Sequence, residues 1–172
     1  YVDGGRDIII ERNKVHHCDI GIEAASEHSG KETKGILIRN NIIYDCNAIS
    51  GIAFGGYDDN RGAAKAVKII NNTLYNNATH ILIQSHAQYA SNLIANNILY
   101  KGTAFSGDLS NVRRSQNFTA NPQFISENDY NFSLSKSSSA LDASSVNQFV
   151  GSEDFYSNKR VVDGEINAGA IQ

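Results

Sequence analysis

Several common features are missing from this chain of 172 residues, and each absence excludes a class of protein. No stretch approaches the ~20 apolar residues of a membrane-spanning helix, so we expect no membrane span. The formal net charge of −3 provides no excess of positive charge, which argues against nucleic acid as a partner. The chain also lacks the apolar stripe with a period of 3.6 residues that helical repeat proteins show.

Methionine is absent altogether, so Tyr1 is not a translation start. A predicted strand, Asp7–Ile10, follows almost at once, with no helix ahead of it. Because an uncovered strand edge invites pairing with another chain, we expect preceding coils of the same protein, or another chain, to cover this end. Tyr1 then follows a cleavage or belongs to a longer protein.

What is present is a repeated phrase. RNNIIY (Arg39–Tyr44), INNTLY (Ile70–Tyr75) and ANNILY (Ala95–Tyr100) are near-copies, and ERNKVH (Glu11–His16) is a degenerate fourth. The second asparagine of each copy is separated from the next by 28, 31 and 25 residues. A period in this range is typical of a stacked solenoid, since one unit cannot bury its apolar face alone.

Each repeat also shows the alternation of a strand with one buried face. Apolar residues lie three positions before the second asparagine and again two positions after it, and most are β-branched. This period of two predicts strands. We therefore predict an all-β fold, a single-stranded right-handed parallel β-helix of about four to six coils. The first set is Ile10, Ile38, Ile69 and Ile94, and the second is Val15, Ile43, Leu74 and Leu99.

In a solenoid, equivalent residues of successive coils form columns with a spacing of ~4.8 Å. An asparagine turned inward at a bend can bond the backbone and the asparagine of the next coil, so that buried polar groups are paired. We therefore predict a structural asparagine ladder and not a binding motif. Its members are Asn13, Asn41, Asn72 and Asn97.

The two cysteines, Cys18 and Cys46, each follow a ladder asparagine by five residues. Equivalent places on adjacent coils would put their Cα atoms ~5 Å apart, close enough for a disulfide. Buried cysteine usually behaves as a small apolar residue, so we expect free thiols. No histidine has a spacing that would support a metal site with them.

The second strand of each coil carries the candidate functional residues. We align three segments, Gly21–His28, Gly51–Asp58 and His80–Ala87. The alignment predicts that alternate apolar side chains point inward, at Ile22, Ala24, Ile52, Phe54, Ile81 and Ile83. Outward polar residues and the small residues beside them then form a shallow trough that suits a linear polar polymer. A solvated outer face is the plain alternative. The outward polar residues are Glu23, Glu27, His28, Tyr57, Asp58, Arg61, Gln84 and His86.

The segment YDDNRG (Tyr57–Gly62) offers two adjacent carboxylates, Asp58 and Asp59. Calcium takes six or more oxygen ligands, and carbonyl groups and water could complete such a shell. The spacing is not that of an EF-hand loop, so a solvated turn is the alternative to a calcium site.

The last third has a different character and predicts a boundary between coils at 1–107 and a last coil with an irregular cap at 108–172. Its motifs resemble the C-terminal end of secreted bacterial right-handed β-helix proteins of the pectate-lyase-like superfamily. The chain departs from their pattern at Asn121, Ser139 and Asn167. It keeps Pro122, Phe124, Asp129, Tyr130, Leu134, Ala140, Asp142, Asp154, Arg160, Gly169 and Ala170.

The resemblance implies a carbohydrate-active protein that is secreted, periplasmic or on the bacterial cell surface. Lyases of this superfamily hold Ca²⁺ near the sugar carboxylate and use lysine or arginine as the proton acceptor, and no lysine here matches that position. We expect this C-terminal motif to form a cap, in which Asp142 and Asp154 bond turn amides and Arg160 pairs with a carboxylate.

Two classes of function remain open. In the first, the trough binds a uronate-containing polysaccharide and cleaves it by β-elimination. A metal or Arg61 neutralises the uronate, and Tyr57 or His86 takes the C5 proton. The substrate-binding residues would be Glu23, Glu27, His28 and Gln84.

A glycoside hydrolase would instead need two carboxylates, for which Glu23 with Glu27 or Asp58 are the candidates. An epimerase is a further enzymatic alternative within the superfamily. In the second class, the chain is a non-catalytic glycan-binding or structural module of a larger secreted or surface protein.

Overall fold

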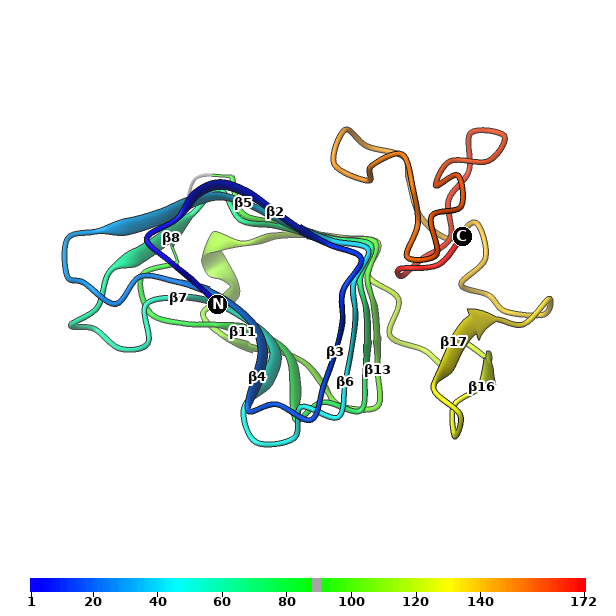
Figure 1. Ribbon diagram of the computed structural model, residues 1–172, viewed down its shortest axis with the longest axis horizontal. Coiled ribbons are helices and arrows are strands. Elements are labelled where there is room, and N and C mark those ends of the chain that lie inside the picture. Colours follow the sequence, from blue (N-terminus) through cyan, green and yellow to red (C-terminus); the bar gives the residue numbers. More distant parts are fainter. Residues whose placement is uncertain (88–90) are drawn as a thin grey trace.

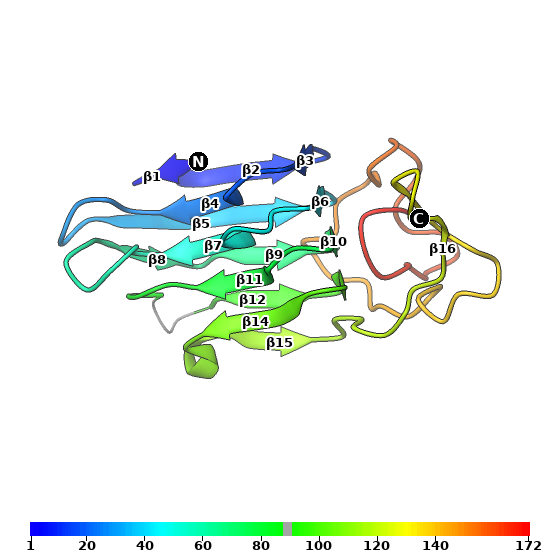
Figure 2. The same cartoon turned by 90° about the horizontal axis from the view of Figure 1, so that it is seen from below.

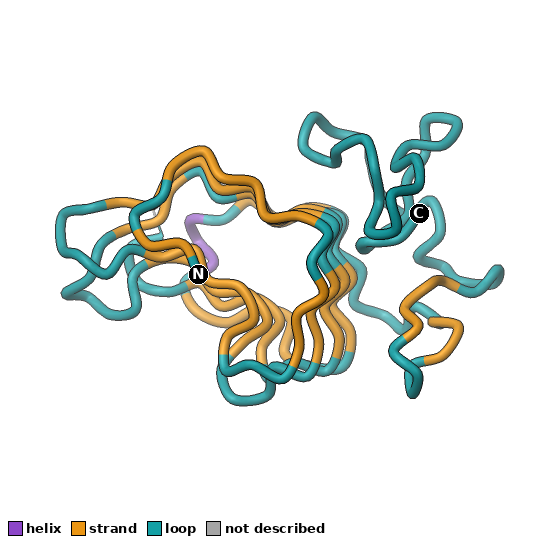
Figure 3. The backbone as a smooth tube through the Cα atoms, in the orientation of Figure 1, coloured by secondary structure: helices purple, strands orange, loops and turns teal. Residues whose placement is uncertain are grey.

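A computed structural model describes residues 1–87 and 91–172. The chain forms a parallel β-solenoid with a C-terminal segment, residues 119–172, beside it (Figure 1). Figure 2 shows the coils stacked on one another, and the tube in Figure 3 shows strands of successive coils superposed. The predicted all-β solenoid is therefore confirmed. Within the described residues, no helix is long and apolar enough to cross a membrane.

Three parallel sheets form the walls of the solenoid. Sheet A contains β1 (Val2–Asp3), β4 (Ile20–Ala25), β7 (Ser50–Gly55), β11 (Thr79–Ile83) and β14 (Thr103–Gly107). Sheet B contains β2 (Arg6–Glu11), β5 (Glu32–Arg39), β9 (Lys68–Ile70), β12 (Leu93–Ala95) and β15 (Arg113–Ser115), with β8 (Ala63–Lys65) paired to β5. Sheet C contains β3 (Lys14–His16), β6 (Ile42–Tyr44), β10 (Thr73–Tyr75) and β13 (Ile98–Tyr100).

The remaining elements are the short 3₁₀ helix η1 (Leu109–Asn111) and an antiparallel hairpin of β16 (Phe124–Ser126) and β17 (Asn131–Leu134). The predicted boundary at 107/108 falls between β14 and η1, so β15 belongs to the last coil.

Strand register confirms the predicted inward columns. Ile38 pairs with Ile10 on one side and with Ile69 on the other, and Ile94 follows. The second column runs through Val15, Ile43, Leu74 and Leu99. In sheet A, the six side chains predicted to point inward are all buried. These columns form one core along the solenoid axis, and its burial supplies the main driving force for folding.

The asparagine ladder is also confirmed, and it has a fifth member that the repeat alignment missed, Asn117. In each of the first four members, Nδ2 donates to the Oδ1 of the next asparagine, at 3.0, 2.9, 3.0 and 2.8 Å along the stack. The backbone N–H of each donates to the same Oδ1. Each turn therefore pairs polar groups that the core would otherwise leave unpaired.

The residue before each ladder asparagine explains the paired NN letters. Asn40, Asn71 and Asn96 have φ angles of 53°, 52° and 61°, and Arg12 and Gln116 share this left-handed conformation. Asparagine tolerates that region better than most residues. The first Asn therefore makes the bend, and the second forms the ladder.

Both cysteines are free thiols, as expected. Cys46 is fully buried, and its backbone N–H donates to Asn77 Oδ1 at 2.9 Å. Burial is the main cause that raises the pKa of the Cys46 thiol. The thiol therefore stays protonated and packs as a small apolar side chain.

The C-terminal segment lies against the side of the solenoid and does not close the end of the stack, where a cap was expected (Figures 1 and 2). Its aromatic residues Phe124 and Phe132 pack on Tyr44, Tyr75 and Ile98 of sheet C. Outward aromatic residues of sheet C thus provide an apolar face that the segment covers. The segment is also held by hydrogen bonds from Asn40, Asn71 and Asn96 at the bends.

The structure can be compared with the cap contacts predicted for three residues. Asp154 is buried, and its Oδ1 accepts from the backbone N–H groups of Tyr156 and Asn158, both at 2.8 Å, as expected for a carboxylate bonding turn amides. Arg160 is also buried, but its Nη2 donates to the carbonyl oxygens of Asn167 and Gly169 at 2.7 and 2.9 Å. Its hydrogen bonds therefore go to carbonyl groups, and not to the expected carboxylate. Asp142 is held through its backbone N–H, which donates to Asn167 Oδ1.

Candidate functional site

The long connections between sheet A and sheet B gather at one corner of the solenoid, on the left in Figure 1. Their described parts are residues 26–31 after β4, residues 56–62 after β7 and residues 84–87 after β11. Functional side chains concentrate on loops that a rigid scaffold positions. Gly62 allows close packing, since a Cβ there would lie only 2.4 Å from Ser26 Oγ.

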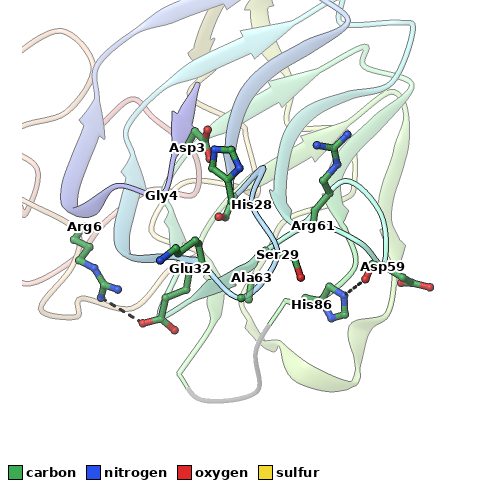
Figure 4. A pocket seen from close by; sticks show the side chains of 14 residues that line it. Asp3, Gly4, Arg6, His28, Ser29, Glu32, Asp59, Arg61, Ala63 and His86 are labelled. Atoms are coloured by element: carbon green, nitrogen blue, oxygen red, sulfur yellow. Dashed lines mark hydrogen bonds and ion pairs between the residues drawn. The ribbon is translucent and has the colours of Figure 1, made fainter.

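An open cleft of about 1050 Å³ lies among these loops (Figure 4). Its charged lining is mixed, and Asp59 and Arg61 lie on the same loop. The titratable residues that line it are Asp3, Arg6, His28, Lys31, Glu32, Asp59, Arg61 and His86.

Arg61 connects two of the loops. Its Nη1 lies 2.9 Å from Glu27 Oε2 and also donates to the Glu27 carbonyl oxygen at 3.3 Å. Glu27 Oε1 accepts from the Tyr1 hydroxyl at 2.9 Å. Desolvation, and then this hydrogen bond, raise the pKa of Tyr1, so the phenol remains a donor. Both ends of the Arg61–Glu27 pair are about two-fifths exposed, so this pair orients the guanidinium and adds little stability.

His86 and Ser85 connect the next pair of loops. His86 Nε2 lies 3.1 Å from the Asp59 carbonyl oxygen, and Ser85 Oγ donates to Asp59 Oδ1 at 2.9 Å. His86 therefore sits at the cleft with one ring nitrogen held by the backbone (Figure 4).

The two carboxylates of the calcium prediction have separate partners. Asp58 Oδ1 accepts from the backbone N–H of Asn60 at 2.8 Å, and Asp58 Oδ2 lies 3.9 Å from Arg61 Nε. Asp59 bonds Ser85 instead. Across the described ranges, no three His, Cys, Asp or Glu side chains form a group that could hold a metal. Calcium binding here therefore stays a prediction, and it would rely on carbonyl groups and water.

Glu23 and Gln84 lie on the outer face of sheet A and do not line the cleft. Gln84 Nε2 donates to Glu23 Oε1 at 2.8 Å, across the strand between them. In that strand, the aligned Ala53 is buried. The expected trough on sheet A is therefore bridged by this hydrogen bond.

The structure brings together only part of the predicted site. His28, Asp59, Arg61 and His86 line one cleft, and Glu27 joins them through Arg61. Tyr57 is 66% exposed and is not among the residues that line it. The catalytic roles of Tyr57, Arg61 and His86 stay predictions.

Sequence reasoning missed Asp3, Arg6, Lys31 and Glu32, which also line the cleft. Arg6 Nη1 pairs with Glu32 Oε1 at 3.3 Å. Asp3 occupies the same column as Ala25, one coil earlier. Extending the alignment of second strands by one coil toward the N-terminus would have found it.

Comparison with known proteins identifies one related sequence, described as an uncharacterized protein, YwoF, of Bacillus subtilis (strain 168). The chain is 47% identical to it over 106 residues, which is 59% of this chain and 22% of YwoF. The chain thus spans about a fifth of that relative's length. No family model matches the chain, and no solved structure matches it.

Proposed function

We propose that this chain is a glycan-binding solenoid module that binds an acidic polysaccharide at the loop cleft. The observation that carries the proposal is the cleft itself, where cationic and imidazole side chains from successive coils face one open space beside three carboxylates, Asp3, Glu32 and Asp59. Arg61 is oriented by Glu27, and Lys31 has no ion-pair partner within the part of the chain that the structure describes. Each of the three carboxylates already has a partner, since Asp3 accepts from the Glu27 N–H, Glu32 pairs with Arg6 and Asp59 accepts from Ser85. The unpaired charge of Lys31 therefore favours an anionic ligand.

Polar hydroxyl and carbonyl groups complete the cleft, and they suit the hydroxyl groups of a sugar. Ser29 and the backbone of Gly30 and Gly62 line it beside the charged residues. Because the cleft is open, a long polymer can enter without threading. A linear polysaccharide therefore fits better than a small enclosed ligand.

Cleavage by β-elimination is the second candidate, and the position of His86 favours it. His86 lies on the cleft, whereas Tyr57 does not, so His86 is the better candidate for removing the C5 proton. Arg61 would neutralise the uronate carboxylate, which lowers the cost of forming the carbanion. The C4–O bond then breaks, and another group protonates the leaving oxygen. Hydrolysis has less support, since Glu23 and Glu27 bond different partners, Gln84 and Arg61.

The same proposal places the protein outside the cytoplasm, where bacterial acidic polysaccharides occur. It also includes further coils or domains in a longer protein, because YwoF is much longer than the matched region. The first coil presents β1, β2 and β3 as the end strands of their sheets, and another coil or chain could pair with this edge.

Calorimetric titration of the chain with tetragalacturonate and tetramannuronate tests the proposal, with a neutral galactose tetrasaccharide as the control ligand. We expect at least one uronate to bind, and Arg61→Ala to weaken it by about tenfold, since charged hydrogen bonds contribute about 1.5–3 kcal/mol. Lys136→Ala, at an exposed position outside the cleft, should bind as the unsubstituted protein does.

Ultraviolet absorbance of the unsaturated product, followed in the same mixtures with and without Ca²⁺, separates elimination from binding alone. Loss of that absorbance in His86→Ala with binding retained would support the second candidate. Absence of binding to every uronate would refute the proposal.

A further inference from the structure

A second polar groove lies on the other side of the solenoid corner, along the outer face of sheet B. Register places Lys68 of β9, Leu93 of β12 and Arg113 of β15 in one column. The neighbouring outward column contains Ile70 and Ala95, which the C-terminal segment covers. The column of Lys68, Leu93 and Arg113 therefore runs along the margin of that segment.

Phe149 of the C-terminal segment forms the opposite wall of this groove. Its carbonyl oxygen accepts from Arg39 Nη1 at 3.1 Å, and Arg39 Nε bonds Glu11 Oε2 at 2.7 Å. The ring packs with Leu37 and Leu93, and it lies 5.6 Å from Lys68 Nζ. The wall is thus fixed to the solenoid by both a hydrogen bond and apolar contacts.

Two adjoining cavities, of about 510 and 500 Å³, make up the groove and share Leu93, Arg113 and Phe149. None of the described residues that line either cavity is Asp or Glu. Neither Lys68 nor Arg113 has an ion pair with a carboxylate among the described residues. Much of the remaining lining consists of amide and hydroxyl side chains, among them Asn111, Ser115, Gln116, Asn147 and Gln148.

The electrostatics of this groove differ from those of the loop cleft. Burial lowers the pKa of Lys68, and no carboxylate offsets the cost of its charge. An anion bound in the groove would supply the missing partner. Lys68 and Arg113 are two coils apart, which corresponds to about 10 Å along the stack, so they can meet two acidic groups of one extended ligand.

We propose that this groove binds an acidic oligosaccharide. Lys68 and Arg113 each pair with a carboxylate of the chain, Phe149 and Leu93 contact the apolar face of a sugar ring, and the amides bond its hydroxyl groups. A sugar fits better than a simple anion, since an ion alone would make no use of the apolar contacts of Phe149 and Leu93 or of the amide side chains. The groove shares no lining residue with the loop cleft, so it extends the proposed function with a separate site.

The test is a titration of the full chain with tetragalacturonate, followed by amide chemical shifts. We expect shifts at residues 113–116 and 145–149. Lys68→Gln and Arg113→Gln should each weaken the binding reported by these amides by about tenfold. Phe149→Leu should weaken it less, and Lys136→Gln, which lies outside the groove, should leave it unchanged.

Three results would overturn the inference. The first is the absence of shifts at these amides, and the second is unchanged affinity in the Lys68→Gln, Arg113→Gln double variant. The third is an equal response to inorganic sulfate, which would show a simple anion site. Arg61→Ala separates the two sites, since it should weaken shifts at the loop cleft and leave those of the groove in place.

Discussion

Acidification should destabilise this protein through one side chain, His80 of β11. The imidazole is fully buried, and its Nδ1 lies 3.3 Å from Asn77 Nδ2. Since the Asn77 amide donates, Nδ1 is the acceptor and Nε2 carries the proton. Nε2 has no hydrogen-bond partner among the described residues, and a Cβ at Gly102 would lie only 3.0 Å from it. A second proton on Nδ1 would face the Asn77 donor without water to solvate it.

Burial lowers the pKa of His80 from its ordinary value of 6.5 to about 4. The unfolded chain therefore binds a proton between pH 6.5 and 4 that the folded chain does not bind. Stability is unaffected by this group above pH 6.5 and falls progressively as the pH decreases toward 4. Since a tenfold change in proton affinity is worth about 1.4 kcal/mol, the loss reaches about 2.5 kcal/mol near pH 4.5.

Urea unfolding at about pH 7.5 and about pH 4.5, for the unsubstituted protein and His80→Leu, isolates this contribution, because other groups titrate alike in both. We expect the free energy of unfolding to fall by about 2.5 kcal/mol less in the variant, which corresponds to about 1 M urea in the midpoint difference. Equal falls in the two proteins would refute the reasoning. A larger fall in the variant would contradict its sign.

Two further predictions concern stability. Asn72→Ala removes a fully buried member of the ladder and leaves the Ile38 carbonyl oxygen and the Asn41 N–H without this partner. It should lower the free energy of unfolding in urea by about 3–5 kcal/mol. Asn117→Ala, at the last member of the ladder, should cost less than half as much. Equal costs would contradict the ladder account. Phe132 is 1% exposed between the hairpin and sheet C, so Phe132→Ala should lower the free energy of unfolding by about 3–5 kcal/mol. Residues 119–172 should then be the first region cut in limited proteolysis. Initial cuts within the coils would contradict this prediction.

The solenoid was predictable because its physics is local and repeated. Ile38 and Ile69 occupy equivalent places in their coils, so alignment of the letters gives the register directly. The ladder follows from the same alignment. The repeat alignment did not find Asn117, because no copy of the repeated phrase surrounds it. Asn117 nevertheless follows Asn97 by 20 residues and accepts a hydrogen bond from it.

The site was less predictable because it depends on loops of unequal length and on contacts between distant segments. Sequence alignment placed Glu23 and Gln84 on one face of the sheet. The alignment could not show that a hydrogen bond joins the two side chains across that face, as the structure does. Arg61 reaches Glu27 across 34 residues, which no repeat predicts. The groove at Phe149 depends on the C-terminal segment lying along the side of the solenoid, whereas the sequence suggested a cap at its end.

The central claim is that loops at one corner of the solenoid bind an acidic polysaccharide. The most direct test is a map of amide chemical shifts over the whole chain as a uronate tetrasaccharide is added. The account predicts that shifts at residues 26–32, 58–63 and 84–87 saturate together and weaken in Arg61→Ala. A map without shifts at those three loops, at ligand concentrations that saturate any other site, would contradict it.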